Sequence, residues 1–135
     1  MSFIDTSRLI AAANADAEFQ LHARLWQARL ELRADEHIVH LTIERGRVAA
    51  AERNEGGDEG AASGQMAEAD VRISAPTADW EALLAAIPRP FFQDLRAACA
   101  HHGFRLDGER LHTAAFYPAI RRLIDLMREV HHVQH

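Results

Sequence analysis

Residues 103–130, GFRLDGERLHTAAFYPAIRRLIDLMREV, contain the change of hydrophobic period that decides the fold. From Phe104 to Asp107 apolar and polar residues alternate, which is typical of a β-strand, and Gly108 ends that alternation. From Leu111 onward the apolar residues recur at intervals of three and four, which predicts an amphipathic helix. The pattern therefore predicts a strand followed directly by a long helix.

The apolar stripe of this helix allows two interpretations. It packs on the sheet of its own domain as ordinary core, or it covers a cavity between helix and sheet that admits a hydrophobic guest. Composition does not separate the two, because the same residue types line pockets and fill cores. The stripe consists of Phe116, Ile120, Leu123, Ile124, Met127 and Val130.

The composition places bounds on the class of protein. A chain of 135 residues, 48% hydrophobic and 26% charged, is long enough for one domain with its own core. A net charge of −5 argues against nucleic acid, which needs a basic surface to replace phosphate counterions. The sequence shows no transmembrane segment and no signal peptide, and its one cysteine, Cys99, cannot form an internal disulfide. We expect one cytoplasmic domain over residues 1–135.

The absence of lysine excludes two kinds of chemistry. All fifteen basic residues are arginine, so a phosphate-binding P-loop and a Schiff-base lysine are both ruled out. No GxSxG or HExxH pattern is present. Among the nine histidines, only His101, His102 and His112 are expected to approach one another, beside Asp107 and Glu109. We therefore predict no catalytic residue, no metal and no cofactor.

The other elements follow from the same change of period. The N-terminal helices, residues 1–25, have Phe19 and Leu21 as expected anchors, and Pro118 should kink or restart the last helix. Pro90 suits a first helical turn, and Gly103 suits the left-handed position after a helix end. Residues 54–66 are read as a flexible loop and residues 131–135 as a frayed tail. Strands are predicted at 26–33, 37–44, 48–52, 69–74 and 104–107, and helices at 6–13, 16–24, 77–87, 90–102 and 111–130.

Two stretches resemble the sterol carrier protein 2 family. They are ADVRIS at 69–74, which leads into ADWEALL at 78–84, and GFRLDGE at 103–109, which leads into the terminal apolar helix. The resemblance covers roughly residues 26–127. It implies an α+β fold with a five-stranded, mainly antiparallel sheet and helices packed on one face. It also implies a hydrophobic tunnel between sheet and helices that takes fatty acyl chains, acyl-CoA or sterols, in a domain that is not generally catalytic.

The sequence departs from that family in two places. Residues 88–102 form a longer connection than is usual there, and could plug or reshape the tunnel. The N-terminal helices are also extra. Within the resemblance, Tyr117 is the most suggestive site residue, because a buried phenol needs a polar partner and could orient a ligand head group. The candidate ligand-binding residues are Trp26, Val39, Leu41, Trp80, Leu84, Phe91, Phe92, Phe116, Tyr117, Ile120, Ile124 and Met127.

Three functions remain open from the sequence. The leading hypothesis is a non-catalytic carrier or accessory domain for a hydrophobic or amphipathic small molecule. The second is a small α+β isomerase or hydrolase acting on a lipophilic substrate, with His112 or Asp107 as the residues to test. The third is an interaction or dimerisation module, a possible homodimer, whose pocket is filled by its own side chains.

Overall fold

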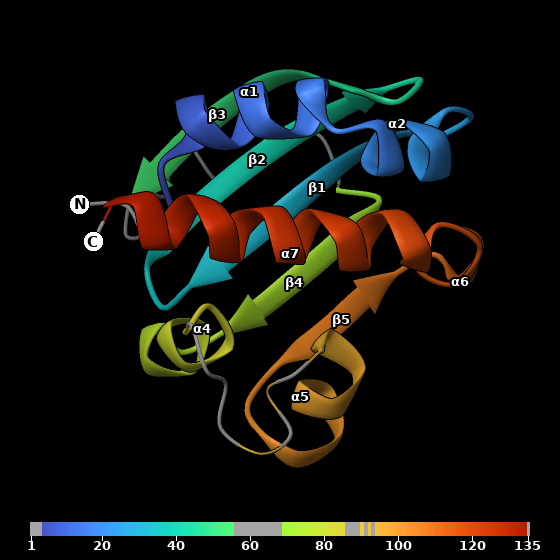
Figure 1. Cartoon of the computed structure of the whole chain (residues 1–135). Coiled ribbons are helices and arrows are strands. Elements are labelled where there is room, and N and C mark those ends of the chain that lie inside the picture. Colours follow the sequence, from blue (N-terminus) through green and yellow to red (C-terminus); the bar gives the residue numbers. More distant parts are fainter. Residues whose placement is uncertain (1–3, 56–68, 86–89, 91, 93, 135) are drawn as a thin grey trace.

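Five strands form one mixed sheet with the spatial order β3-β2-β1-β4-β5 (Figure 1). A computed structural model of the chain describes residues 4–55, 69–85, 90, 92 and 94–134. Neighbouring strands are antiparallel except β1 and β4, which are parallel, so the predicted mainly antiparallel sheet is confirmed. The strands are β1 (Gln27–Ala34), β2 (His37–Glu44), β3 (Arg47–Glu55), β4 (Val71–Ala75) and β5 (Arg105–Gly108).

The first three strands form the predicted meander because its two turns are short. Asp35 in the first turn, and Arg45 with Gly46 in the second, adopt the positive φ angles that such hairpin turns require. The register then places Leu30 opposite Leu41 and, on the other side of β1, beside Val71. Apolar residues of three central strands therefore share one face of the sheet.

The helices α1, α2 and α7 lie across that apolar face, and α7 runs in front of β1 and β4 in Figure 1. Helices α4 and α5 lie beside the β4–β5 side of the sheet. The short helix α6 joins the end of β5 to α7. The bounds are α1 (Thr6–Ala15), α2 (Ala17–Ala23), α4 (Thr77–Leu83), α5 (Leu95–His101), α6 (Arg110–Ala115) and α7 (Tyr117–Gln134).

Aspartates set the first residue of three helices. The side chains of Asp5, Asp16 and Asp94 accept hydrogen bonds from backbone N–H groups three residues later, at 3.1, 2.7 and 2.8 Å. Each bond satisfies one of the donors that a helix leaves free at its N-terminus. Asp94, and not Pro90, therefore begins the helix predicted at 90–102, which is α5 and starts at Leu95.

Other helix boundaries also differ from those predicted. Helix α4 ends at Leu83, before the predicted end at 87, because a residue that precedes proline disfavours helix and Pro88 follows closely. Helix α7 extends to Gln134, so most of the predicted tail is helical. The expected fresh start near Pro118 is confirmed, because α6 ends at Ala115 and α7 begins at Tyr117.

Two residue roles from the sequence were wrong. Leu21 is not an anchor of α2, since 57% of it is exposed, whereas Phe19 is fully buried as predicted. Gly103 does not adopt a left-handed φ angle. A Cβ atom there would lie 2.5 Å from Oδ2 of Asp79, which accepts a hydrogen bond from the Gly103 N–H at 3.0 Å. A side chain at this position would therefore displace the Asp79 carboxylate from its hydrogen bond.

The predicted loop at 54–66 begins later than expected. Asn54 and Glu55 pair with Ile38 and His37 as part of β3. The remainder of that loop, from residue 56, lies outside the described residues.

Candidate functional site

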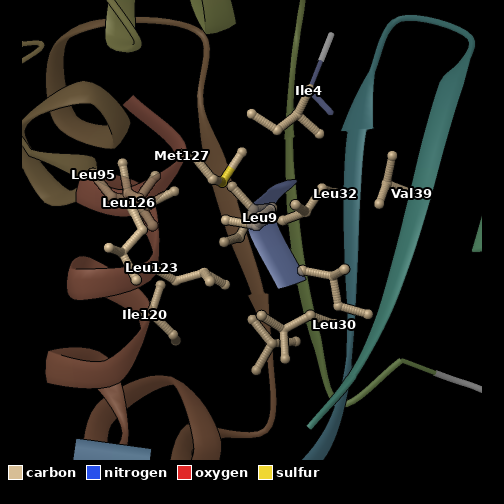
Figure 2. Packing of buried hydrophobic residues seen from close by; sticks show 14 of the residues in the cluster. Ile4, Leu9, Leu30, Leu32, Val39, Leu95, Ile120, Leu123, Leu126 and Met127 are labelled. Atoms are coloured by element: carbon tan, nitrogen blue, oxygen red, sulfur yellow. The ribbon is translucent and has the colours of Figure 1, made fainter. Parts of the chain in front are cut away.

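A continuous apolar layer lies between α7 and the sheet. In Figure 2 the side chains of Ile120, Leu123 and Met127 point from α7 toward Leu30 and Leu32 on β1. All five are buried, with exposed fractions of 1% or less. The stripe recognised in the sequence is therefore the inward face of α7, and the layer beneath it is the candidate ligand site.

The predicted ligand-binding residues lie together in this layer and at its two ends. Phe91 lies outside the described residues, and Phe116 and Tyr117 are partly buried and pack against the cluster. The other nine are buried members of one hydrophobic cluster: Trp26, Val39, Leu41, Trp80, Leu84, Phe92, Ile120, Ile124 and Met127.

The layer is closed. Trp26, Leu41, Trp80, Ile120 and Met127 have no accessible surface at all. A side chain without accessible surface is in contact with protein atoms on every side, so no space the size of a water molecule borders these five. Around these five described residues, a guest can therefore be accommodated only if the packing between helix and sheet opens.

One end of the layer is formed by Trp26 and its contacts. The ring of Phe116 stacks on the Trp26 indole, with centroids 5.2 Å apart and planes 12° apart. The Trp26 Nε1–H donates to Nδ1 of His112 at 3.0 Å. On the other side of that imidazole, Nε2 lies 3.9 Å from Oδ1 of Asp70. The buried indole is thus satisfied by a residue of α6.

A surface groove adjoins this end. It has a volume of about 320 Å³ and lies between the end of α2 and the junction of α6 with α7. Leu21 and Leu25 beside it are 57% and 78% exposed, and Leu111 on α6 is 66% exposed. The groove is lined by Leu21, His22, Arg24, Leu25, Ala115, Phe116 and Pro118.

The other end of the layer is formed by Trp80. Its Nε1–H donates to the carbonyl of Arg33 at 2.8 Å, and its ring meets Phe104 edge to face at 4.9 Å. A second surface hollow of about 440 Å³ lies beside α4. Phe92 and His102, whose rings stack 3.7 Å apart, form part of its wall together with Asp79 and Glu81.

Tyr117 already has a polar partner within the protein. Its hydroxyl accepts a hydrogen bond from the backbone N–H of Arg96 at 3.1 Å, and the Arg96 guanidinium lies 4.1 Å above its ring. Burial raises the pKa of the phenol. The side chain therefore links the start of α7 to the first turn of α5.

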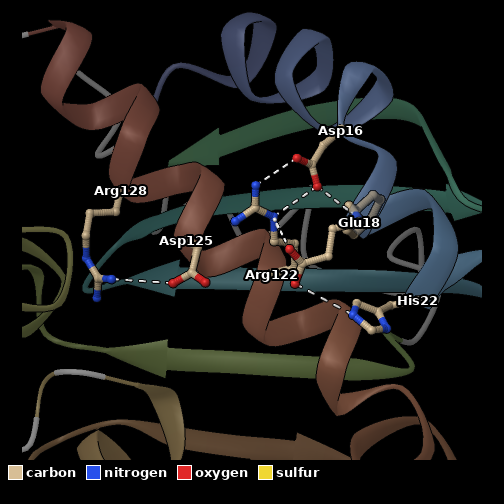
Figure 3. A network of polar contacts seen from close by, with 7 residues as sticks. Asp16, Glu18, His22, Arg122, Asp125 and Arg128 are labelled. Carbon is tan, nitrogen blue, oxygen red and sulfur yellow. Dashed lines mark hydrogen bonds and ion pairs between the residues drawn. The ribbon is translucent and has the colours of Figure 1, made fainter.

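The helical layer is held together by charged groups at its edge (Figure 3). The Arg122 guanidinium of α7 donates from Nη2 and Nε to the two carboxylate oxygens of Asp16, at 2.8 and 3.0 Å. Glu18 lies between Arg122 and His22, at 3.7 Å from each. Arg128 donates to the carbonyl of Leu83 at 2.7 Å, which joins α7 to the end of α4.

Two of the histidines that were expected to approach one another, His102 and His112, have different partners. His102 contacts the carbonyl of Pro90 at 3.1 Å, whereas His112 contacts Trp26 and Asp70. Asp107 pairs with Arg105 at 3.7 Å. No group of three or more His, Cys, Asp or Glu side chains that could hold a metal ion is found among the described residues.

Sequence reasoning missed a buried polar cluster on the opposite face of the sheet. Glu31 and His40 face each other on β1 and β2, are 4% and 3% exposed, and lie 3.3 Å apart. Arg33 and Arg72 approach the other oxygen of Glu31 at 3.1 and 3.2 Å. The hydrogen bond from His40 is the main cause that lowers the pKa of Glu31. Alternation alone had predicted an exposed face here.

The sheet order, the helical layer on one face and the long last helix define the sterol carrier protein 2 fold. No protein-family model and no curated protein matches the chain. Several solved structures do match the chain. A crystal structure of sterol carrier protein 2 superposes with a TM-score of 0.74 and 22% identity, over 96% of this chain and 99% of that one. The resemblance drawn from the sequence is confirmed as a likeness of fold.

Two further structures have the same architecture. A conserved hypothetical protein of Thermus thermophilus, described as possibly a sterol carrier protein, has a TM-score of 0.67 and 22% identity, over 96% of this chain and 90% of that one. A UbiJ-SCP2 ubiquinone synthesis protein has a TM-score of 0.54 and 13% identity, over 91% and 87%. No helix among the described residues is long and apolar enough to cross a membrane.

Proposed function

We propose that this protein is a non-catalytic binding domain for a hydrophobic or amphipathic small molecule, of the fatty acyl, acyl-CoA or sterol kind. The ligand would lie between α7 and the sheet, in contact with the predicted residues of that layer. The observation that supports this most strongly is the fold shared with sterol carrier protein 2 over almost the whole chain. A cytoplasmic location and a homodimer stay predictions.

The closed interior sets a condition on this proposal. Because Trp26, Ile120 and Met127 have no accessible surface, binding must move a helix before apolar ligand surface can be buried. Burial of the ligand contributes about 25 cal/mol per Å² of apolar surface, which must exceed the cost of that movement. Helix α6 is the helix that we expect to move most easily, since none of its residues is buried.

Native mass spectrometry of the full chain tests the proposal. The protein purified without denaturant should carry an acyl or sterol adduct, or should acquire one from a panel of palmitate, palmitoyl-CoA and cholesterol. Leu25→Ser is the matched control, because Leu25 is exposed and lies outside the buried layer. Binding that survives in Leu25→Ser supports the interior site.

The outcomes that contradict the proposal are equally specific. A chain that carries no adduct and binds no member of the panel is not a lipid-binding domain of this kind. Binding that disappears in Leu25→Ser places the ligand in the surface groove and contradicts the interior site.

The closed layer favours one second candidate, the interaction module with a filled pocket. In that case Leu21, Leu25 and Leu111 form a surface that a protein partner or a second copy covers. Light scattering separates the candidates, because a stable dimer that binds no lipid supports the module and a lipid-binding monomer contradicts it.

A further inference from the structure

Helix α6 is weakly attached to the rest of the fold. It has six residues, none of them buried, and Leu111 is 66% exposed. Its N-cap residue Glu109 makes no side-chain capping bond, although the Glu109 backbone N–H donates to the carbonyl of Asp70 at 3.3 Å. A short helix without a buried face is stabilised by its few tertiary contacts rather than by itself.

Two of those tertiary contacts are made with Trp26. One is the hydrogen bond from the indole to His112, and the other is the stack of Phe116 on the indole ring. Trp26 is fully buried, and α6 and the residue after it help to cover its indole. The groove of about 320 Å³ lies on the outer side of Phe116. If α6 moves away, the groove and the layer beneath Trp26 become continuous.

The hydrogen bond to Trp26 fixes the protonation state of His112 in this closed form. An indole N–H only donates, so Nδ1 of His112 must carry a lone pair. A protonated imidazole has N–H donors on both nitrogens and therefore cannot accept the indole bond. Protonation would leave the buried Trp26 N–H without its acceptor, and would strengthen the attraction of Nε2 for the Asp70 carboxylate.

The Asp70 carboxylate is positioned to form an ion pair with a protonated His112. Its Oδ2 accepts a hydrogen bond from the Arg29 backbone N–H at 2.9 Å, while Oδ1 faces His112 at 3.9 Å. Protonation of His112 therefore removes its hydrogen bond with Trp26 and favours its ion pair with Asp70, the residue before β4. Other ionisable groups near this position are Glu109 and Arg110 at the start of α6, Arg29 beside Asp70 on β1, and His22 and Arg24 in the lining of the groove.

We propose that α6 is a door over Trp26 and that His112 is its latch. The neutral imidazole accepts the indole hydrogen bond and keeps Trp26 covered, whereas protonation turns the imidazole from Trp26 toward Asp70, which uncovers the indole and admits a hydrophobic ligand. This inference rests on the proposed function. It goes further by assigning the entrance to the groove between the end of α2 and α6, and by making uptake faster in mild acid.

Acrylamide quenching of Trp26 fluorescence tests the latch without any ligand. Trp80→Phe leaves Trp26 as the single tryptophan, and the quenching constant is compared at pH 8 and pH 5.5. The constant should rise roughly threefold to fivefold in acid, which is the change expected from loss of one hydrogen bond. If Trp80→Phe does not fold, the two indole N–H signals of the unchanged chain give the same comparison by NMR.

Three variants make the test specific. His112→Asn places a carbonyl oxygen where Nδ1 was and cannot be protonated, so quenching should stay low at both pH values. His112→Leu has no acceptor, so quenching should be high at both. His101→Gln, on an exposed residue of α5, should behave as the parent. An acid-induced rise that persists in His112→Asn overturns the latch, as does low quenching in His112→Leu.

Binding of dodecanol, which is uncharged between pH 5.5 and pH 8, tests whether a ligand enters past α6. Its association rate should follow the same order as the quenching, highest in His112→Leu and lowest in His112→Asn. If dodecanol associates equally fast with every variant, the entrance lies elsewhere and this proposal fails while the proposed function stands. If dodecanol binds to none of the variants, the proposed function itself is contradicted.

Discussion

The side chain of Asp16 joins α2 to α7, and its replacement should show how much the helical layer depends on one carboxylate. Its side chain caps α2 through the Phe19 N–H and forms two hydrogen bonds with Arg122 of α7. Asn caps a helix about as well as Asp, so Asp16→Asn removes the charge and keeps the cap. Asp16→Ala removes both.

The structure sets the expected magnitudes. Loss of the cap costs about 1 kcal/mol. The contact with Arg122 is bidentate, and the Arg122 and Asp16 side chains are 22% and 16% exposed, so the screening by solvent is partial. We expect about 1 to 2 kcal/mol for the loss of this contact. Asp16→Asn should therefore lower the free energy of unfolding by about 1 to 2 kcal/mol, and Asp16→Ala by about 2 to 3 kcal/mol.

The lowered pKa of Asp16 determines how this difference in stability changes with pH. The hydrogen bonds from Arg122 are the main cause that holds the pKa of Asp16 below its ordinary value of 3.8. A carboxyl group with a lowered folded-state pKa stabilises the fold above its unfolded-state pKa, and this contribution is lost as the pH falls below that value. The difference between the parent and Asp16→Asn should thus be full at pH 7 and shrink below about pH 4.

Urea unfolding at pH 7, 4 and 3 measures these differences. Arg122→Met is the partner variant, and the double-mutant cycle with Asp16→Asn should give a coupling of about 1 kcal/mol. If Asp16→Asn is as stable as the parent at pH 7, or if the difference between them is the same at every pH, the ion pair is not what holds α2 to α7.

Three further changes test other parts of the structure. Gly108→Ala should lower the free energy of unfolding, measured by thermal unfolding, by more than about 3 kcal/mol, because φ is +138° and a Cβ would clash with the carbonyl of Asp70. A decrease below about 1 kcal/mol would contradict this, since the backbone would then relieve the clash easily. Glu31→Gln should lower the free energy of unfolding by about 2 kcal/mol at pH 7. Because the pKa of Glu31 is lowered, its charge stabilises the fold above about pH 4.5, so the variant should lose less stability than the parent below that pH. An equal loss of stability in acid for parent and variant would contradict this. Ile124→Ala should lower the free energy of unfolding by about 3 kcal/mol, because it leaves a cavity in the proposed site. The same cavity should make the variant bind dodecanol more tightly in a fluorescence titration. Weaker binding would place the ligand elsewhere.

The sequence predicted those features that depend on local pattern. The strands around Leu30, Leu41 and Ile73 and the inward stripe of α7 follow from hydrophobic period, and the turn at Gly46 follows from turn chemistry. The start of α7 beside Pro118 also follows, since proline suits a first helical turn. These features survive because each is decided by residues close together in the chain.

Features decided by distant residues were not predictable. The burial of Glu31 depends on pairing with two other strands, which brings His40 of β2 and Arg72 of β4 beside it, and alternation does not reveal this. Gly103 donates a hydrogen bond to Asp79 of α4 and does not adopt the left-handed φ that the end of its own helix suggested. The bond between Trp26 and His112 joins residues that are 86 positions apart. In the candidate site, the hydrophobic pattern and the family resemblance predicted which apolar residues would gather, but only the coordinates show how closely the described ones are packed.

Methyl NMR of the full chain during titration with a saturated fatty acid tests the central claim most directly. The account predicts that the methyl signals of Ile120, Ile124 and Met127 on α7, and of Leu30 and Leu32 on β1, shift as the ligand enters the layer between them. Shifts confined to the exposed Leu21, Leu25 and Leu111, with the interior signals unchanged at saturation, would contradict it.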